Sequence, residues 1–180
     1  METPDRTSEP EIGTLTSGDN LSYWFSSPIK PLSFEKLNQN IDTDILIIGG
    51  GIAGLTTAYC LAKEGCKVIL VEDGFIGSGE TGRTTAHISS VLDNHYFELE
   101  KLFDEHTAKL VANSHMAAIE WIANTVKLHK INCHFKRVDG YLFSHPSDTK
   151  KTLEKEYEAT KRAGLTTDLL NSVPFLAAEK

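Results

Sequence analysis

The first half of the sequence contains one strand, glycine turn, helix and strand in direct succession. An apolar run at residues 44–48 leads straight into the glycine-rich stretch 49–54. Apolar residues then recur at helical spacing up to Gly65, and residues 67–72 return to an extended, β-branched pattern. This succession predicts a βαβ unit, in which a crossover helix joins two parallel strands.

The glycines of this unit have spacing that predicts a dinucleotide site. Gly49 permits a turn too tight for a Cβ, Gly51 lets the backbone approach a pyrophosphate, and Gly54 lets helix and strand pack closely. The pyrophosphate would rest on the free amides at the helix N-terminus, among them those of Ile52 and Ala53.

An acidic residue at the tip of the second strand completes the fingerprint. Glu72 lies about twenty residues after the first glycine, where its carboxylate can accept hydrogen bonds from both hydroxyls of an adenosine ribose. Asp73 follows it directly. A 2′-phosphate would meet negative charge here, which disfavours the phosphorylated nicotinamide cofactor. The strand, the helix and the acidic residue together give the glycine motif a specificity that it lacks alone.

A second motif, residues 77–87, reads Gly-Ser-Gly-Glu-Thr-Gly-Arg-Thr-Thr-Ala-His. It resembles the second flavin-contacting loop of the FAD-dependent oxidoreductases of the D-amino-acid oxidase class, a superfamily that includes glycine oxidase and sarcosine oxidase. The βαβ unit fits that class equally well. Residues 79–87 and 137–143 resemble most closely the bacterial subgroup in which such a flavin domain precedes a Rieske iron–sulfur domain. The resemblance covers about residues 20–180.

The loop also makes chemical sense as a cradle for FAD, the cofactor that the resemblance implies. Hydroxyls of Thr81, Thr84 and Thr85 can bond to pyrophosphate and ribityl oxygens, and Arg83 can supply charge to the phosphates or hold the loop. His87 can touch the flavin ring, bond covalently to it as in some relatives, or satisfy a neighbouring carbonyl; we predict contact only. The predicted cofactor-binding residues are Gly49, Gly51, Ile52, Ala53, Gly54, Glu72, Asp73, Gly79, Thr81, Arg83, Thr84, Thr85, Ala86 and His87.

The predicted fold class is α/β: a Rossmann-like FAD-binding βαβ domain with a helical insertion and the start of an α+β substrate domain. We expect a polar, partly disordered N-terminal segment at 1–40, the FAD-binding domain at 41–132 and an incomplete substrate domain at 133–180. The aromatic run at 21–25 is expected to dock onto the folded domain.

The remaining elements follow from local patterns. A short helix around 96–103 is expected to be capped by Asp93 or Asn94, and a longer one capped by Asp104 carries an apolar stripe of Leu110, Ala117, Trp121 and Leu128. Further on, the patterns predict a hairpin of strands 133–138 and 141–144, a charged helix 148–163 ended by Gly164, and a strand at 166–170.

Composition excludes several classes of partner. At a formal net charge of −7 the 180-residue chain offers no basic face for nucleic acid or anionic lipid. Its longest apolar run is too short for a membrane span and no secretory signal follows Met1, so a cytoplasmic location is expected. The three cysteines form neither CxxC nor a Rieske ligand motif, and no metal site is predicted.

By resemblance, we expect a flavoenzyme portion that transfers a hydride from a substrate carbon, of an amine or amino acid, to flavin N5. The electron acceptor would be oxygen or an iron–sulfur domain absent from this chain. The alternatives are a truncated nucleotide-binding module without activity and, less favoured because of the threonine loop, an NAD-dependent dehydrogenase. In this class later strands complete the sheet, so 180 residues alone are expected to be inactive. No catalytic residue is predicted, because the chemistry belongs to the flavin.

Overall fold

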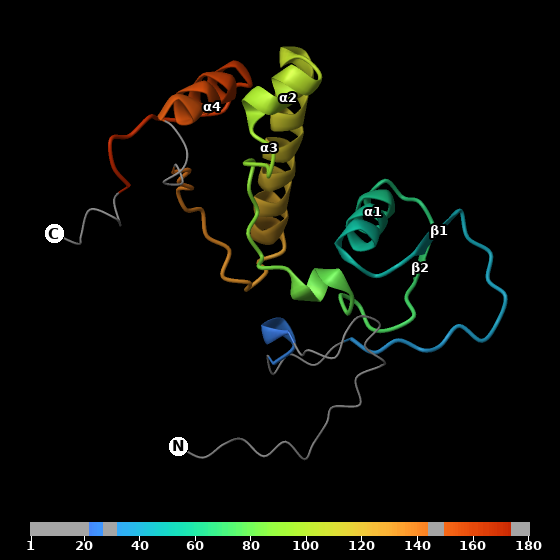
Figure 1. Ribbon diagram of the computed structural model, residues 1–180. Helices are drawn as coiled ribbons and strands as arrows, with labels where there is room; N and C mark the ends of the chain where they lie inside the picture. Colours follow the sequence, from blue (N-terminus) through green and yellow to red (C-terminus); the bar gives the residue numbers. More distant parts are fainter. Residues whose placement is uncertain (1–21, 27–31, 144–149, 174–180) are drawn as a thin grey trace, which may run out of the picture. The chain divides into compact units, whose positions relative to one another are not determined.

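The computed structural model describes residues 22–26, 32–143 and 150–173 (Figure 1). The chain divides into two compact units, Met1–His87 (unit 1) and Ile88–Lys180 (unit 2). The predicted polar stretch 1–20 lies outside the described residues. The elements, in chain order, are the 3₁₀ helix η1 (Tyr23–Ser26), β1 (Ile45–Ile48), α1 (Ile52–Lys63), β2 (Val68–Val71), the 3₁₀ helix η2 (Glu80–Arg83), α2 (Tyr96–Leu102), α3 (Glu105–Leu128) and α4 (Lys150–Arg162).

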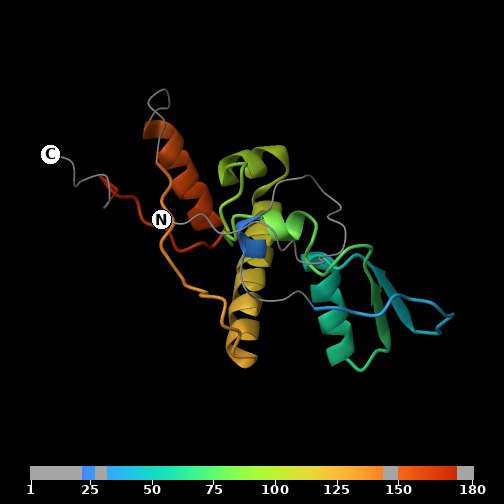
Figure 2. The same ribbon diagram turned by 90° about the horizontal axis from the view of Figure 1, so that it is seen from below.

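Unit 1 contains the predicted βαβ unit. Strands β1 and β2 pair in parallel, with Ile45 opposite Val68 and Ile48 opposite Val71, and α1 is the helix that connects them (Figure 2). The helix begins at Ile52, earlier than its apolar period indicates. Gly54 lies in the first turn of the helix, and because it has no side chain, it adds no apolar residue to the helical pattern there.

Unit 2 is built on close helix packing. Its core consists of Tyr96 and Leu99 from α2, Ala108 and Ala112 from α3, and Ala159 and Ala163 at the C-terminal end of α4. Small side chains at these contacts let the helices approach closely. Asp104 caps α3 as predicted: its carboxylate accepts a hydrogen bond from the Thr107 amide at 2.6 Å, which lowers the pKa of Asp104.

A buried carboxylate from α4 joins that helix to the start of α2. Glu156 is 5% exposed, and its two oxygens accept hydrogen bonds from the amides of Tyr96 at 3.0 Å and Phe97 at 3.2 Å. These are first-turn amides, which a helix cannot satisfy by itself. The predicted capping by Asp93 or Asn94 is therefore wrong: His95 is the N-cap residue, and the acceptor comes from sixty residues further along the chain.

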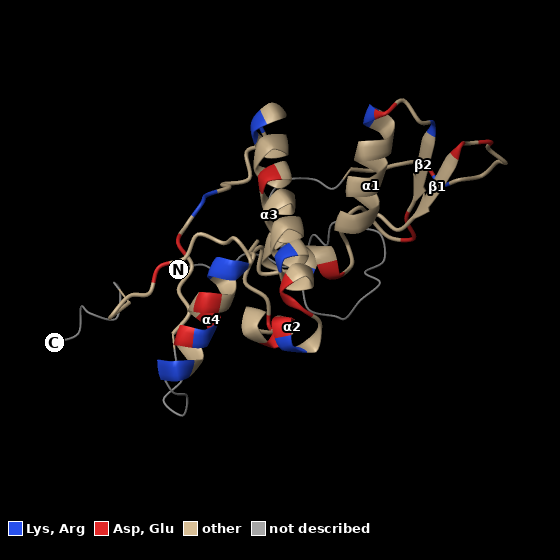
Figure 3. Ribbon diagram, turned by 90° about the horizontal axis from the view of Figure 1, so that it is seen from above, with Lys and Arg blue, Asp and Glu red and all other residues tan. Residues whose placement is uncertain are grey.

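The outer face of α4 carries charges of both signs, as predicted (Figure 3), but Glu156, which we expected on that exposed face, is buried. Arg162 forms a two-pronged contact with Glu100 of α2, with Nε–Oε1 at 2.9 Å and Nη2–Oε2 at 2.6 Å. This contact raises the pKa of Arg162. Gly164 then ends the helix with a φ of +88°, a conformation that glycine adopts without steric cost.

The long helix predicted after Asp104 is present, but its apolar stripe is not the face that packs in the core, and the strands predicted beyond it are wrong. The apolar stripe of α3 is exposed at Leu110 (54%) and Leu128 (65%), because the face of Ala108 and Ala112 is the one that packs in the core. Residues 133–143 and 166–170 form no strand in the described part of the chain. His134 has a φ of 53°, which interrupts an extended run, and an isolated hairpin is marginal in water.

We predict that Glu156→Ala destabilises unit 2. The substitution leaves one buried and one partly buried amide without their acceptor, and hydrogen bonds to charged groups are worth about 1.5–3 kcal/mol. Urea unfolding, followed by the circular dichroism signal of the helices, should show that the free energy of unfolding falls by about that amount. Glu158→Ala, on the exposed face of the same helix, is the control and should change stability little. Equal losses for the two variants would show that the Glu156 bonds do not hold α2 and α4 together.

Candidate functional site

The glycine turn at the end of β1 has the tight geometry that its sequence predicts. Gly49 has a φ of +104°, and its amide donates to the Val71 carbonyl at 2.8 Å, so the turn starts as a continuation of the sheet. A Cβ at Gly54 would lie 2.0 Å from the Gly49 carbonyl oxygen. Any side chain at position 54 would therefore push the helix away from the turn.

Glu72 closes the glycine turn from the end of β2. One carboxylate oxygen accepts a hydrogen bond from the Gly50 amide, and the other accepts one from the Gly74 amide at 3.1 Å. These two bonds, that of Gly50 first, hold the pKa of Glu72 below its ordinary value. A carboxylate has about four acceptor sites, so capacity for ribose hydroxyls remains.

A hydroxyl of the second motif reaches the start of α1. Thr81 Oγ1, on η2, accepts a hydrogen bond from the Ile52 amide at 2.9 Å. A Cβ at Gly51 would lie 3.1 Å from the same oxygen. The structure thus brings the two predicted motifs together at the N-terminus of α1. The amides of Ala53 and Gly54 belong to the same first turn, where the helix supplies no carbonyl partner.

The side chains at the end of the second motif make local hydrogen bonds. The Ala86 amide donates to Thr84 Oγ1 at 3.2 Å, and His87 Nδ1 lies 3.2 Å from Thr85 Oγ1. All four residues are exposed, and Ala86 has a φ of 60°, a strained value for a residue with a side chain. His87 therefore meets a hydroxyl rather than a carbonyl.

The other predicted residues flank these contacts. Asp73 is exposed beside Glu72, Gly79 precedes η2, and Arg83 is half-buried at the end of η2. All the predicted cofactor residues lie in unit 1.

The residues that are present fit the adenosine and pyrophosphate half of FAD. A glycine turn without Cβ atoms lies beside first-turn amides, where a pyrophosphate can approach the backbone. Glu72 supplies an ionised acceptor at the edge of the same turn. The combination of amide donors next to one carboxylate acceptor suits a phosphate joined to a ribose.

Sequence reasoning missed residues that support the site. The Gly50 amide donates a hydrogen bond to Glu72. The Gly50 carbonyl accepts a hydrogen bond from the Gly77 amide at 3.0 Å, so a bond between backbone groups also joins the two motifs. A Cβ at Gly50 would lie 2.7 Å from Ile76 Cδ1. The triple glycine at 49–51 was the available signal, since an unbroken glycine run exceeds what the fingerprint needs.

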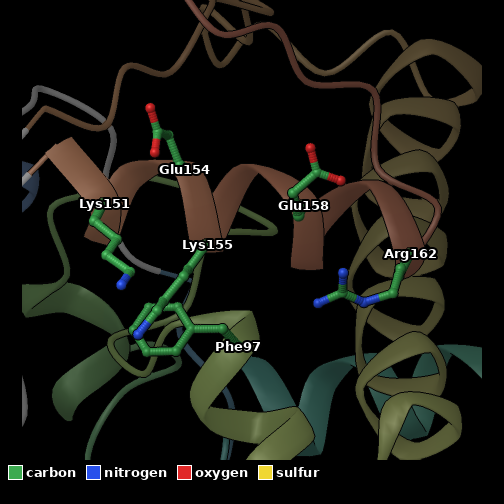
Figure 4. A pocket seen from close by; sticks show the side chains of 6 residues that line it. All are labelled: Phe97, Lys151, Glu154, Lys155, Glu158 and Arg162. Carbon is green, nitrogen blue, oxygen red and sulfur yellow. The ribbon is translucent and has the colours of Figure 1, made fainter.

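A hollow of about 350 Å³ in unit 2 lies apart in sequence from these motifs (Figure 4). Lys155 extends over the Phe97 ring, with its nitrogen 6.0 Å from the ring centroid. The hollow is lined by Phe97, Lys151, Glu154, Lys155, Glu158 and Arg162. Positive and negative side chains alternate along this lining, so its charge pattern favours neither an anionic nor a cationic ligand.

Among the described residues no group of three His, Cys, Asp or Glu side chains is placed to hold a metal ion. No helix in the described ranges has both the length and the apolar character that crossing a membrane requires.

Comparison with known proteins identifies the family. The sequence matches the family "FAD dependent oxidoreductase" (DAO) over residues 44–178. YhfW of Bacillus subtilis (strain 168), named as a Rieske 2Fe-2S iron-sulfur protein, is 34% identical over 159 residues, which are 88% of this chain and 31% of YhfW. Gamma-glutamylputrescine oxidoreductase of Escherichia coli (strain K12) is 31% identical over 144 residues, which are 79% of this chain and 33% of that protein.

A shorter match concerns the beta subunit of sarcosine oxidase from Rhizobium meliloti (strain 1021), which is 51% identical over 49 residues, 26% of this chain and 12% of the subunit. No solved structure matches the chain. The chain spans about a third of the length of YhfW and of the Escherichia coli oxidoreductase. The matched residues begin with β1 and include both motifs, so the chain belongs to the DAO family of FAD-dependent oxidoreductases, whose Rossmann-like α/β fold its βαβ unit represents.

Proposed function

We propose that residues 45–87 bind the adenosine and pyrophosphate half of FAD within an oxidoreductase. The observation that carries the proposal is the meeting of both motifs at the N-terminus of α1, where Thr81 bonds to the Ile52 amide at 2.9 Å. Glu72 would accept the ribose hydroxyls, and the amides of Ala53 and Gly54 would donate to the pyrophosphate. Thr84, Thr85 and His87 lie on the exposed end of the loop and would face the ribityl and flavin portion.

When bound, FAD supplies N5 as the acceptor of a hydride from a substrate carbon. We propose an amine or amino acid as the substrate class, because gamma-glutamylputrescine and sarcosine appear in the names of two relatives. The protein's part is to orient the cofactor and to surround it with fixed donors and charges. The name of YhfW supports an iron–sulfur domain as the electron acceptor, with oxygen as the alternative.

The first prediction is that the natural polypeptide carrying these residues retains FAD and not NAD. Heat-denatured protein should release an adenine-containing flavin, identified by chromatography and absorbance. Calorimetry with NAD is the matched measurement and should show no tight binding. Release of no flavin, together with tight NAD binding, would favour a nicotinamide-dependent dehydrogenase and contradict the proposal.

The second prediction concerns the ribose contact. Glu72→Ala should weaken FAD binding by on the order of 10- to 100-fold, because hydrogen bonds to a charged group contribute about 1.5–3 kcal/mol. Fluorescence titration of the apoprotein with FAD measures the change. Glu64→Ala, an exposed carboxylate at the end of α1, is the control. An unchanged affinity for Glu72→Ala would show that the ribose is held elsewhere.

Gly51→Val should weaken FAD binding more than Glu72→Ala does. The new side chain would start 3.1 Å from Thr81 Oγ1, so it would displace that hydroxyl as well as fill the space of the pyrophosphate. The same titration measures it. An affinity above that of Glu72→Ala would argue against a pyrophosphate beside Gly51.

We also predict a pH dependence of folding. Because the pKa of Glu72 is below its ordinary value of 4.5 in the folded protein, its contribution is present above that value and is lost as the pH falls through the folded pKa. Urea unfolding of wild type and Glu72→Gln should therefore differ most at pH values above 4.5 and converge as the pH falls through the lowered pKa of Glu72. A difference between the two proteins that stays constant with pH would contradict the assignment.

A further inference from the structure

The N-terminal 3₁₀ helix η1 lies on the second motif within unit 1. The indole nitrogen of Trp24 donates a hydrogen bond to the Thr84 carbonyl at 2.8 Å, across sixty residues of sequence. The Phe25 ring packs edge-on against Phe75, with the ring centroids 5.2 Å apart. Phe75 is 8% exposed, so this contact belongs to the small core of unit 1. The expectation that the aromatic run docks is thus confirmed for Trp24 and Phe25.

Gly82, in the middle of η2, lacks a side chain for a reason unrelated to a cofactor. A Cβ at this position would lie 2.1 Å from Phe25 Cζ and 2.6 Å from the Gly77 carbonyl oxygen. Gly82 is buried, and the Phe25 ring occupies the space beside it. The glycine therefore allows an aromatic ring from η1 to seat against the backbone of the loop.

The two contacts hold the backbone that directly follows Thr81, the residue that meets α1. Phe25 seats against Gly82, Trp24 holds the carbonyl of Thr84, and Thr81, whose hydroxyl accepts from the Ile52 amide, directly precedes Gly82. A displacement of η1 would free the backbone of 82–84. The position of the Thr81 hydroxyl at the helix N-terminus depends on that backbone.

We propose that Trp24 and Phe25 are positioning residues for FAD, in that η1 acts as a strap that fixes the loop 77–87 in its cofactor-binding conformation. This inference rests on the proposed function. The strap bonds to the Thr84 carbonyl and packs against Gly82, and its effect on the start of α1 passes along this backbone to Thr81. Loss of the strap leaves the glycine turn and Glu72 in place and loosens the loop.

Hydrogen exchange of the apoprotein tests the strap without any cofactor. In the natural polypeptide, Trp24→Phe keeps an aromatic ring but removes the N–H donor, and Phe25→Ala removes the ring. Both should speed amide exchange in peptides covering 77–87 and leave those covering 55–63, in the body of α1, unchanged. The matched controls are Trp121→Phe, in unit 2, and Phe34→Ala, an exposed phenylalanine of unit 1. Unchanged exchange at 77–87 in both strap variants would overturn the proposal.

FAD titration tests the consequence for the cofactor. Trp24→Phe should raise the dissociation constant about 3- to 10-fold, the range that one net hydrogen bond supports. Phe25→Ala should raise it by on the order of 10-fold, and Phe25→Leu, which refills the space with an apolar side chain, should restore most of the affinity.

The visible circular dichroism of bound flavin should change in the two strap variants, while the urea midpoint of the apoprotein shifts little. Faster exchange with unchanged FAD affinity and an unchanged flavin spectrum would overturn the positioning role. If the urea midpoint falls strongly and the loss of FAD affinity is in proportion, η1 contributes to stability alone. That result would also overturn the positioning role. If wild type binds no FAD, the proposed function fails, and hydrogen exchange alone then decides whether η1 holds the loop.

Discussion

The hydrogen bonds that the Glu72 carboxylate accepts from the amides of Gly50 and Gly74 are the constraint on which unit 1 depends. They fix the glycine turn after β1 to the end of β2, and so they set where α1 begins. An unpaired backbone amide in this turn would weaken the fold, and the Glu72 carboxylate, which stays ionised, supplies the acceptor that the Gly50 and Gly74 amides need. Pairing one with the other leaves an acceptor at the edge of the turn and donors at its helix.

The same physical device recurs in unit 2. Glu156 accepts from the first-turn amides of Tyr96 and Phe97, as Glu72 accepts from the amides of Gly50 and Gly74. In both units a carboxylate from one element satisfies backbone donors of another. Such bonds are stronger than those between neutral groups, and they specify which elements meet. Alanine contacts at Ala108, Ala112 and Ala159 then allow close helix packing around the bond in unit 2.

The sequence predicted those elements whose signals are local. The strands of the βαβ unit, the Asp104 cap and the end of α4 at Gly164 each depend on residues within a few positions of one another. Periodicity and capping chemistry report such neighbours directly. The family resemblance stated from the two motifs is confirmed by the match over residues 44–178.

The contacts that sequence reasoning did not predict join distant residues. Gly50 and Glu72 are 22 positions apart, Ile52 and Thr81 are 29, and Tyr96 and Glu156 are 60. No periodic pattern marks such pairs, because the partner is chosen by tertiary packing. The hairpin at 133–144 failed for the opposite reason. Its local signal was present, but in the described residues 133–143 a φ of 53° at His134 interrupts the extended run, and an isolated hairpin is marginal in water.

The central claim is that the turn after β1, Glu72 and the start of α1 hold the adenosine and pyrophosphate of FAD. A crystal structure of the natural polypeptide with FAD tests it most directly. The account predicts both ribose hydroxyls within hydrogen-bonding distance of the Glu72 carboxylate and the pyrophosphate beside Gly51, on the first-turn amides of α1. An adenosine bound elsewhere, with Glu72 still bonded only to Gly50 and Gly74, would contradict it.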